Sequence, residues 1–338
     1  MTLVKISILL ATFCASLLGS GMVRRYALRA KLLDIPNSRS SHATPTPRGA
    51  GLAIALSSLA ASSVLACLDL VDTKTILALV AGGAIALVGF LDDRRRLSAK
   101  LRFIVHISAA IVAVAILGGV PVDFFGSFGL NNYWVGAGLA VVVFAWATNL
   151  FNFMDGIDGL AGTEAIFISA AGAILNFLND GNSGITVAWL CIAAATLGFL
   201  PWNWPPARLF MGDVGSGFLG FTLTVLAMTT SRRVGIPIEV WAILGGVFLV
   251  DASITLIRRM VRGDNWFEAH RMHAYQHLAL KWRGHLPVTL GVGAVNLVWL
   301  LPWAFFAAGH QRYAMLCMIV ALLPLALLAL LAGAGKER

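Results

Sequence analysis

Residues 149–162, Asn-Leu-Phe-Asn-Phe-Met-Asp-Gly-Ile-Asp-Gly-Leu-Ala-Gly, close an apolar stretch that is long enough to lie in a bilayer. Within them, a carboxylate or carboxamide side chain recurs at every third position: Asn149, Asn152, Asp155 and Asp158. Neighbours three apart lie close together on a helix, and the glycines that follow indicate a helix end. Oxygen ligands at the mouth of a membrane helix suit a hard cation such as Mg²⁺. The alternative is a polar turn between two spans, which is disfavoured because carboxylates at membrane depth are costly unless they are used.

The composition of the whole chain indicates a membrane protein. Of its 338 residues, 59% are hydrophobic and only 12% are charged, whereas soluble domains carry about 25% charged residues. Apolar stretches recur along the chain, and each can cross a hydrocarbon core of about 30 Å as a helix. We therefore expect an all-α polytopic fold, with a single integral-membrane domain over residues 1–338. The expected transmembrane helices number about eleven: 3–23, 50–68, 75–91, 102–119, 133–151, 161–178, 184–201, 213–229, 239–257, 287–308 and 313–331.

The basic residues predict the orientation of these spans. Arg24 and Arg25 follow the first apolar run, which favours an uncleaved anchor with its N-terminus outside. An odd number of spans then places the C-terminus in the cytoplasm. In this orientation 20 Lys and Arg residues lie on cytoplasmic segments and 5 on external ones, which agrees with the positive-inside rule. The net charge of +9 is thus explained by topology and by a phosphate-bearing substrate, with no need for nucleic acid.

The polar clusters all fall on the side predicted to be cytoplasmic. They lie in or beside five segments that we expect to form the active-site loops: 24–49, 92–102, 149–160, 202–213 and 258–286. The external links are short and carry no such cluster. A transporter instead tends to place its polar groups near the middle of the membrane. The one-sided pattern therefore favours chemistry at the cytoplasmic surface.

Asp92 and Asp93 stand side by side at the cytoplasmic end of a predicted span. Two adjacent carboxylates repel each other unless a cation or a substrate proton lies near them. Lys100 begins the next span, where its point charge could meet a phosphate. The arginines between them are typical of a positive-inside loop.

Asp213 opens another predicted span within the segment Phe210-Met-Gly-Asp-Val-Gly-Ser-Gly. A carboxylate at a helix N-terminus is favoured by the helix dipole, so a simple cap is one interpretation and a cation site is the other. The glycines allow a ligand or a neighbouring backbone to approach closely. Phe210 could stack on a planar base or serve as an interfacial aromatic residue.

The longest cytoplasmic loop contains His270, Arg271 and His273. These histidines lack the cysteine or carboxylate partners of a zinc site. A phosphate is a better match, because Arg271 offers a bidentate fork and the histidines supply flanking donors. A solvated loop is the alternative.

Together these segments resemble the polyprenyl-phosphate N-acetylhexosamine-1-phosphate transferases, a family that includes the phospho-N-acetylmuramoyl-pentapeptide transferases of peptidoglycan synthesis. The resemblance covers nearly the whole chain and rests on four motifs: Asp92-Asp93 with Lys100, Asn149-x-x-Asn152-x-x-Asp155-Gly-x-Asp158-Gly, Phe210-Met-Gly-Asp213-x-Gly-Ser, and the His270 loop. It implies a multi-pass enzyme of the bacterial inner membrane, with a periplasmic N-terminus and its active site facing the cytoplasm. Such an enzyme transfers N-acetylhexosamine 1-phosphate from a UDP-sugar to undecaprenyl phosphate and releases UMP.

The resemblance also implies roles for individual residues. Asn152 and Asp213 would bind Mg²⁺, with Mn²⁺ as an alternative ion and Asp155 close by as a catalytic residue. Asp92 or Asp93 would orient or deprotonate the lipid phosphate, with nucleophilic attack as a rival role. A phosphate monoester has a second pKa of about 6, so the acceptor is already largely ionised at pH 7 and a strong base is unnecessary.

The residues expected to bind the substrates come from all the motifs. Phe210 would stack on uracil, and Asp158 would lie close to the nucleoside. The remaining residues, of which the basic ones would hold phosphates, are Lys100, Asn149, His270, Arg271 and His273.

Two departures from the peptidoglycan enzymes narrow the subfamily. Residues 270–273 read His-Arg-Met-His, where those enzymes carry adjacent histidines, which argues against a muramoyl-pentapeptide substrate. This loop and residues 36–42 look like the Gram-negative transferases that initiate O-antigen chains, which use UDP-linked N-acetylated sugars, often 6-deoxy ones. We therefore expect the first step of O-antigen and lipopolysaccharide synthesis. The peptidoglycan enzyme and a lipid-linked sugar transporter remain alternatives, and a homodimer is left open.

Overall fold

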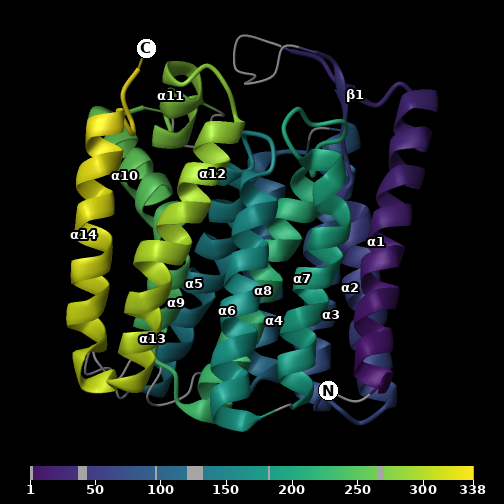
Figure 1. The fold of residues 1–338 in the computed structure, drawn as a ribbon, viewed down its shortest axis with the longest axis vertical. Coiled ribbons are helices and arrows are strands. Elements are labelled where there is room, and N and C mark those ends of the chain that lie inside the picture. The colour runs from purple at the N-terminus through teal and green to yellow at the C-terminus, as the bar shows by residue number, and fades with distance from the viewer. Residues whose placement is uncertain are drawn as a thin grey trace.

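The computed structural model describes residues 3–36, 44–95, 97–119, 132–181, 183–264 and 270–337. Long helices run side by side between two ends of the molecule, and the chain begins at one end and finishes at the other (Figure 1). The elements are α1 (Leu3–Arg29), β1 (Leu33–Asp34), β2 (Thr46–Pro47), α2 (Gly51–Cys67), α3 (Thr73–Arg95), α4 (Ala99–Ile116), α5 (Tyr133–Met154), α6 (Leu160–Asp180), α7 (Gly184–Asn203), α8 (Asp213–Val234), α9 (Ile238–Leu244), α10 (Gly246–Arg262), α11 (Ala274–Lys281), α12 (Leu286–Val295), η2 (Asn296–Leu300), α13 (Leu301–Gly309), η3 (Gln311–Tyr313) and α14 (Ala314–Ala332).

The expected all-α, multi-pass fold is confirmed, although fewer helices qualify as spans than the eleven expected. Within the described ranges, nine helices are long and apolar enough to cross a membrane, and α9 with α10 makes a tenth if the pair is counted as one span. The segment α2 is apolar but has only 17 residues. The antiparallel pairing of β1 with β2 joins two residues of each strand and is a local feature of the loop before α2.

The span expected over 239–257 is broken into two helices, α9 and α10. The chain bends by 86° where α9 ends and α10 begins. At this bend Gly246 packs closely against α14, since a Cβ there would lie 2.6 Å from Leu322 Cδ2. A hydropathy profile does not reveal the bend, because α9 and the start of α10 are both apolar.

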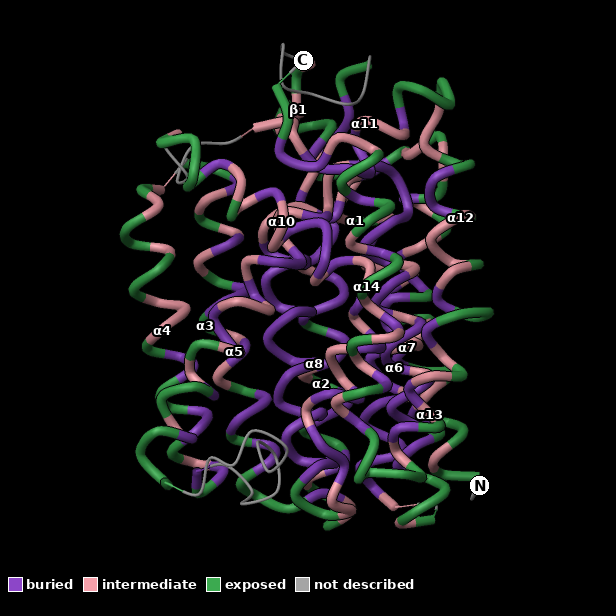
Figure 2. The backbone as a smooth tube through the Cα atoms, turned by 90° about the vertical axis from the view of Figure 1, so that its left-hand side faces the viewer, coloured by how far each residue is buried: buried purple, intermediate pink, exposed green. Residues whose placement is uncertain are grey.

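The helix α8 forms the centre of the bundle. Every residue from Val214 to Ser231 is buried, whereas large apolar side chains such as Leu18 and Leu331 are exposed on the outer helices. Figure 2 shows this contrast between a buried interior and exposed outer surfaces. Exposed apolar surface on a bundle of this length is suited to lipid.

Close packing of α3 against α8 fixes one end of the bundle. A Cβ at Gly89 would lie 2.5 Å from backbone atoms of Asp213, so only glycine allows α3 to approach the start of α8 this closely. The end of α3, the end of α5 and the start of α8 meet at the end of the molecule that carries β1, α11 and the C-terminus (Figure 1). The polar motifs are therefore brought together at one end of the bundle.

Candidate active site

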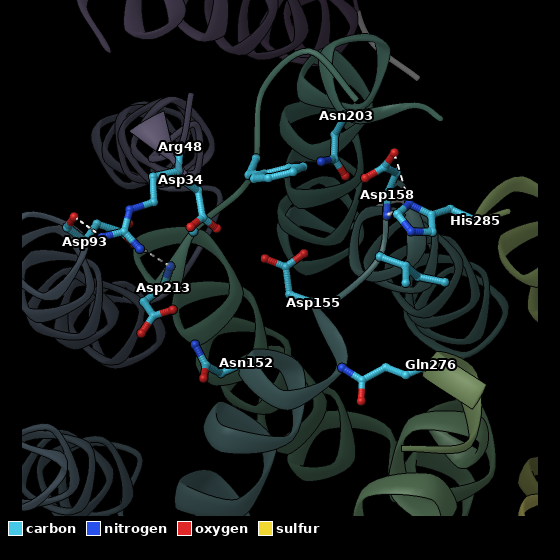
Figure 3. Close-up of a pocket in the computed structure, with 14 residues that line it drawn as sticks. Asp34, Arg48, Asp93, Asn152, Asp155, Asp158, Asn203, Asp213, Gln276 and His285 are labelled. Atoms are coloured by element: carbon cyan, nitrogen blue, oxygen red, sulfur yellow. Dashed lines mark hydrogen bonds and ion pairs between the residues drawn. The ribbon is translucent and has the colours of Figure 1, made fainter. Parts of the chain in front are cut away.

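A polar cavity of about 220 Å³ lies where these helix ends meet. Its lining residues come from β1, from α3, α5, α7, α8 and α11, and from the segments that flank these elements (Figure 3). They are Asp34, Arg48, Asp93, Asn152, Asp155, Gly156, Ile157, Asp158, Asn203, Phe210, Gly212, Asp213, Gln276 and His285.

One end of the cavity is built around Asp93, at the last turn of α3. The Arg48 guanidinium lies 3.8 Å from Asp93 Oδ1 and also donates a hydrogen bond to the Asp93 carbonyl oxygen. The Asp213 N–H donates to the same Oδ1 at 3.3 Å. Gly212 has a φ of +76°, and a side chain there would collide with Asp93 Oδ2. Glycine is thus required twice, for backbone conformation and for the close approach of the carboxylate.

Arg102 joins the two acidic motifs. Its Nη1 donates to Asp92 Oδ2 at 3.0 Å and to Asp213 Oδ2 at 2.8 Å. The Asp92 carboxylate also accepts the Leu97 N–H and does not line the cavity. Asp92 therefore holds Arg102, while its neighbour Asp93 faces the cavity.

Asp155 lies in the middle of the cavity, directly after the last residue of α5 (Figure 3). Its side chain is partly open to the cavity but lies deep within the protein. This burial, together with the negative charges of Asp213, Asp93 and Asp158, raises the pKa of the Asp155 carboxyl well above its usual range. Such a cluster of carboxylates is a place where a cation would be stabilised.

Asn152 lies one helical turn before Asp155, beside the first turn of α8. Its Nδ2 donates to Ser216 Oγ at 3.2 Å, which leaves the carboxamide oxygen outside that bond. The prediction that Asn152 and Asp213 share one site agrees with their positions, since both line the cavity.

The other end of the cavity is built around Asp158. Its Oδ2 accepts the Ala207 N–H at 2.9 Å and lies 3.1 Å from His285 Nδ1. Its main-chain oxygen accepts the Thr289 hydroxyl at 2.9 Å. Asn203 Oδ1 accepts the N–H of the adjacent Gly159 at 2.9 Å, so this turn is held by two other segments of the chain, 203–207 and 285–289.

The His270 segment is anchored beside the cavity by Asp251 of α10. The Asp251 carboxylate accepts the backbone N–H groups of Ala274 and Tyr275 at the start of α11 and lies 3.3 Å from His273 Nδ1. The His270 ring stacks on His273 with centroids 4.9 Å apart. Burial, with His273 and the positive charge of Arg259 close by, lowers the pKa of His270 to about 3.

The structure brings some of the predicted residues into the cavity and leaves others outside it. Those that line it are Asp93, Asn152, Asp155, Asp158, Phe210 and Asp213. Those outside its lining are Asp92, Lys100, Asn149, His270, Arg271 and His273. Lys100 is exposed at the start of α4, and Asn149 Nδ2 donates back to the Ala145 carbonyl oxygen at 2.7 Å. The roles of all twelve stay predictions.

Several residues at the site were missed by sequence reasoning: Asp34, Arg48, Arg102, Gln276 and His285. Arg102 lies two residues after Lys100, the predicted phosphate ligand. Arg48 stands in a loop rich in turn residues, and His285 is a lone histidine, so neither belongs to a recognisable chemical pattern. Only the fold brings them to the carboxylates.

The cavity fits a magnesium ion better than a metal held by protein ligands alone. Among the described residues, no group of three or more His, Cys, Asp or Glu side chains is arranged to hold a metal. Mg²⁺ is typically bound by one or two carboxylates, waters and substrate phosphates. Asp213 and Asn152 supply such oxygen ligands, and the buried Asp93 Oδ2 has no hydrogen-bond partner within the described part of the chain. This ligand set is compatible with Mg²⁺ or Mn²⁺.

A second, mainly apolar cavity of about 250 Å³ opens beside the first, between α1, α2 and α3. Arg48 and Asp93 line both cavities. Apolar side chains such as Met22, Leu52 and Phe90 form much of its wall. A polar and an apolar cavity therefore share one ion pair.

Comparison with known proteins matches the sequence of this chain to a family. Residues 75–231 match the family described as glycosyl transferase family 4. A probable undecaprenyl-phosphate N-acetylglucosaminyl 1-phosphate transferase of Bacillus subtilis is 33% identical over 76% of this chain and 72% of its own length. A decaprenyl-phosphate N-acetylglucosaminephosphotransferase of Mycobacterium tuberculosis is 30% identical over 86% and 78%, respectively. The undecaprenyl-phosphate alpha-N-acetylglucosaminyl 1-phosphate transferase of Escherichia coli K12 is 29% identical over 81% and 76%.

Proposed function

The chain belongs to glycosyl transferase family 4, and on that basis we propose that it transfers N-acetylglucosamine 1-phosphate from UDP-N-acetylglucosamine to a polyprenyl phosphate, releasing UMP. It is a multi-pass membrane enzyme of the phospho-sugar transferase class. The observation that carries the proposal is the pair of cavities that meet at Arg48 and Asp93. A water-soluble sugar nucleotide and an amphiphilic acceptor need a polar and an apolar site that adjoin.

In the proposed reaction, a phosphate oxygen of the lipid attacks the β-phosphorus of the sugar nucleotide. The bond from that phosphorus to the bridging oxygen breaks, and UMP leaves with the oxygen. Phosphoryl transfer requires positioning and charge neutralisation more than covalent chemistry by the protein. When bound, Mg²⁺ would neutralise charge on the diphosphate, and Asp213 and Asn152 would hold it.

Asp93 is better placed than Asp92 to act on the lipid phosphate. It lines both cavities and forms an ion pair with Arg48, whereas Asp92 holds Arg102. Arg48 could hold the acceptor phosphate at the junction. Because that phosphate is largely ionised at pH 7, we assign Asp93 a positioning role, with general base and nucleophile as its rivals.

The apolar cavity supports a lipid acceptor, because its wall can cover the chain next to the phosphate. Undecaprenyl phosphate is the acceptor named for the Bacillus and Escherichia relatives, and a decaprenyl phosphate for the mycobacterial one. We propose undecaprenyl phosphate, a bacterial cytoplasmic membrane and a site that faces the cytoplasm. We further propose that this transfer initiates the synthesis of a surface polysaccharide, and O-antigen is the polysaccharide that we favour.

The names of the relatives also bear on which sugar the UDP-linked donor carries. The three relatives described above are named for N-acetylglucosamine, which favours this sugar over muramoyl-pentapeptide and over the 6-deoxy sugars expected from the sequence. Membership of an enzyme family also favours a transferase over a lipid-linked sugar transporter.

The test uses purified full-length protein with undecaprenyl phosphate, Mg²⁺ and UDP-N-acetylglucosamine labelled with ³²P at the β-phosphate. The label should move to the lipid as unlabelled UMP is released. Release of labelled UDP would show transfer of the sugar alone. No UMP from folded protein across a panel of UDP-N-acetylhexosamines, 6-deoxy sugars included, would overturn the proposal.

A further inference from the structure

We propose that His285 is a positioning residue that aims the Asp158 carboxylate at the base of the sugar nucleotide and thereby sets the preference for uracil. The inference rests on the proposed function and on the prediction that Asp158 lies close to the nucleoside. His285 directly precedes α12 as its N-cap residue; it follows Asp158 by 127 residues in the chain, and no motif in the sequence links the two.

The two oxygens of the Asp158 carboxylate differ in their contacts. Oδ2 is occupied by the Ala207 N–H at 2.9 Å and lies 3.1 Å from His285 Nδ1. Within the described part of the chain Oδ1 makes no hydrogen bond, and the Asp158 side chain lines the cavity. With Oδ2 held from two sides, Oδ1 is the acceptor that remains for a ligand.

His285 can hold Asp158 in either of two ways. Without a proton, Nδ1 accepts the Asp158 N–H at 3.3 Å; with one, it would pair with Oδ2, from which it lies 3.1 Å. Both arrangements fix Asp158 relative to α12. The position of its side chain therefore depends on His285, whichever tautomer is present.

The location of the pair fits base recognition. Figure 3 shows Asp158 and His285 at one side of the cavity, with Asp93, Arg48 and Asp213 at the other and Asp155 between them. We expect the diphosphate to bind beside Asp213 and Asn152, the residues that would hold the cation. The nucleoside would then lie at the other side of the cavity, beside Asp158. Asp158 lies away from the cation ligands Asp213 and Asn152, and there its carboxylate can accept a hydrogen bond from the base.

A carboxylate oxygen distinguishes the two pyrimidines by chemistry alone. Uracil presents an N3–H donor, whereas cytosine presents an unprotonated N3 that accepts hydrogen bonds. Against cytosine, the acceptor Oδ1 would face another acceptor and lose its partner, which is the stronger form of discrimination in a buried site. A rotated Asp158 would lose this discrimination without losing the phosphate contacts.

The experiment measures UMP and CMP binding to the full-length protein by titration calorimetry, together with KM and kcat for UDP-N-acetylglucosamine. His285→Ala should weaken UMP binding by roughly tenfold, the loss of one hydrogen bond to a charged group, while CMP binding changes little. KM should rise more than kcat falls. His285→Asn, whose amide can replace Nδ1, should restore most of the UMP preference.

Two matched variants separate positioning from general damage. Thr289→Val removes the hydrogen bond to the main-chain oxygen of Asp158, and it should lower stability while keeping the ratio of UMP to CMP affinity. His310→Asn changes an exposed histidine at the other end of the bundle and should change nothing. An unchanged affinity ratio in His285→Ala, or the same ratio change in Thr289→Val, would overturn the proposal. Absence of UMP release by the wild type would instead overturn the proposed function.

Discussion

Arg102 shows how one side chain can hold an active site together. A single guanidinium nitrogen donates to carboxylates of α3 and α8, which have like charge and would otherwise repel each other. The side chains of Arg102 and Asp213 are each 31% exposed, so solvent screens part of this attraction. The ion pairs should therefore matter more for the position of Asp213 than for the stability of the fold.

This reasoning predicts the result of Arg102→Met. UMP release should fall by about a hundredfold because Asp213 is displaced, while the free energy of unfolding falls by only about 1 kcal/mol. The matched variant is Arg233→Met, which breaks an ion pair with Asp180 at the opposite end of α8. Equal losses of activity in the two variants would show that Arg102 has no special role.

His270 gives a prediction about pH. Its pKa is lowered to about 3 by burial, with His273 and the positive charge of Arg259 close by, whereas an unfolded histidine titrates near 6.5. The unfolded chain therefore binds a proton that the folded chain does not, so stability is lost as the pH falls from about 6.5 towards 3. Between pH 7 and pH 5, the thermal midpoint of His270→Asn should fall less than that of the wild type.

The same shift bears on the chemistry of His270. A neutral ring between pH 6 and pH 8 can offer a hydrogen bond to a phosphate but no charge. The pH dependence of UMP release over this range should thus be the same in His270→Asn and in the wild type. A change in the rate of UMP release near pH 6.5 that is present in the wild type and absent from His270→Asn would show that His270 titrates in this range, and would contradict the prediction.

At the scale of elements, glycines decide how closely the helices carrying the carboxylates approach. Gly89→Ala places a methyl group where α3 meets the backbone of Asp213. We expect a loss of about 1–3 kcal/mol, typical of overpacking, with a large loss of UMP release. Gly138→Ala in α5 is the control, since a Cβ there has no neighbour within 4 Å. Thermal unfolding and activity in detergent check both, and equal behaviour of the two variants would contradict the packing argument.

Hydropathy predicted the helices well because each span must be apolar along its whole length. It failed at the junction of α9 and α10, where the composition stays apolar through the 86° bend. It also treated Asp92 and Asp93 alike. Successive residues on a helix point about 100° apart, so one carboxylate faces the cavity and the other turns to Arg102.

At the scale of the whole molecule, the cavity gathers residues from position 34 to position 285. Asn152, Asp155 and Asp158 could be predicted because polar side chains recur there at every third position, and Asp213 because it stands in a glycine-rich segment at the start of a span. Arg48 and His285 could not be predicted, because a single arginine or histidine in a sequence does not indicate which residues lie beside it in the fold. Identifying them required the packing of α3, α8 and α12 at one end of the bundle.

The orientation of that end in the membrane is a separate prediction. In a protein whose four cysteines are replaced, a new cysteine at exposed Arg283 should be protected from a membrane-impermeant maleimide in spheroplasts. A cysteine at exposed Arg312, at the opposite end, should react. The reverse pattern would place the active site outside the cell and contradict the positive-inside assignment.

The central claim is that the cavity at Asp213 is where the sugar phosphate is transferred. Its most direct test compares UMP release by Asp213→Asn and by Asp180→Asn, with membrane insertion checked for both. Asp180 is also an ion-paired carboxylate, but it lies at the other end of the bundle. We predict that Asp213→Asn abolishes UMP release while Asp180→Asn stays close to the wild type. Near-normal release by a correctly inserted Asp213→Asn protein would remove Asp213 from the metal site and contradict the account.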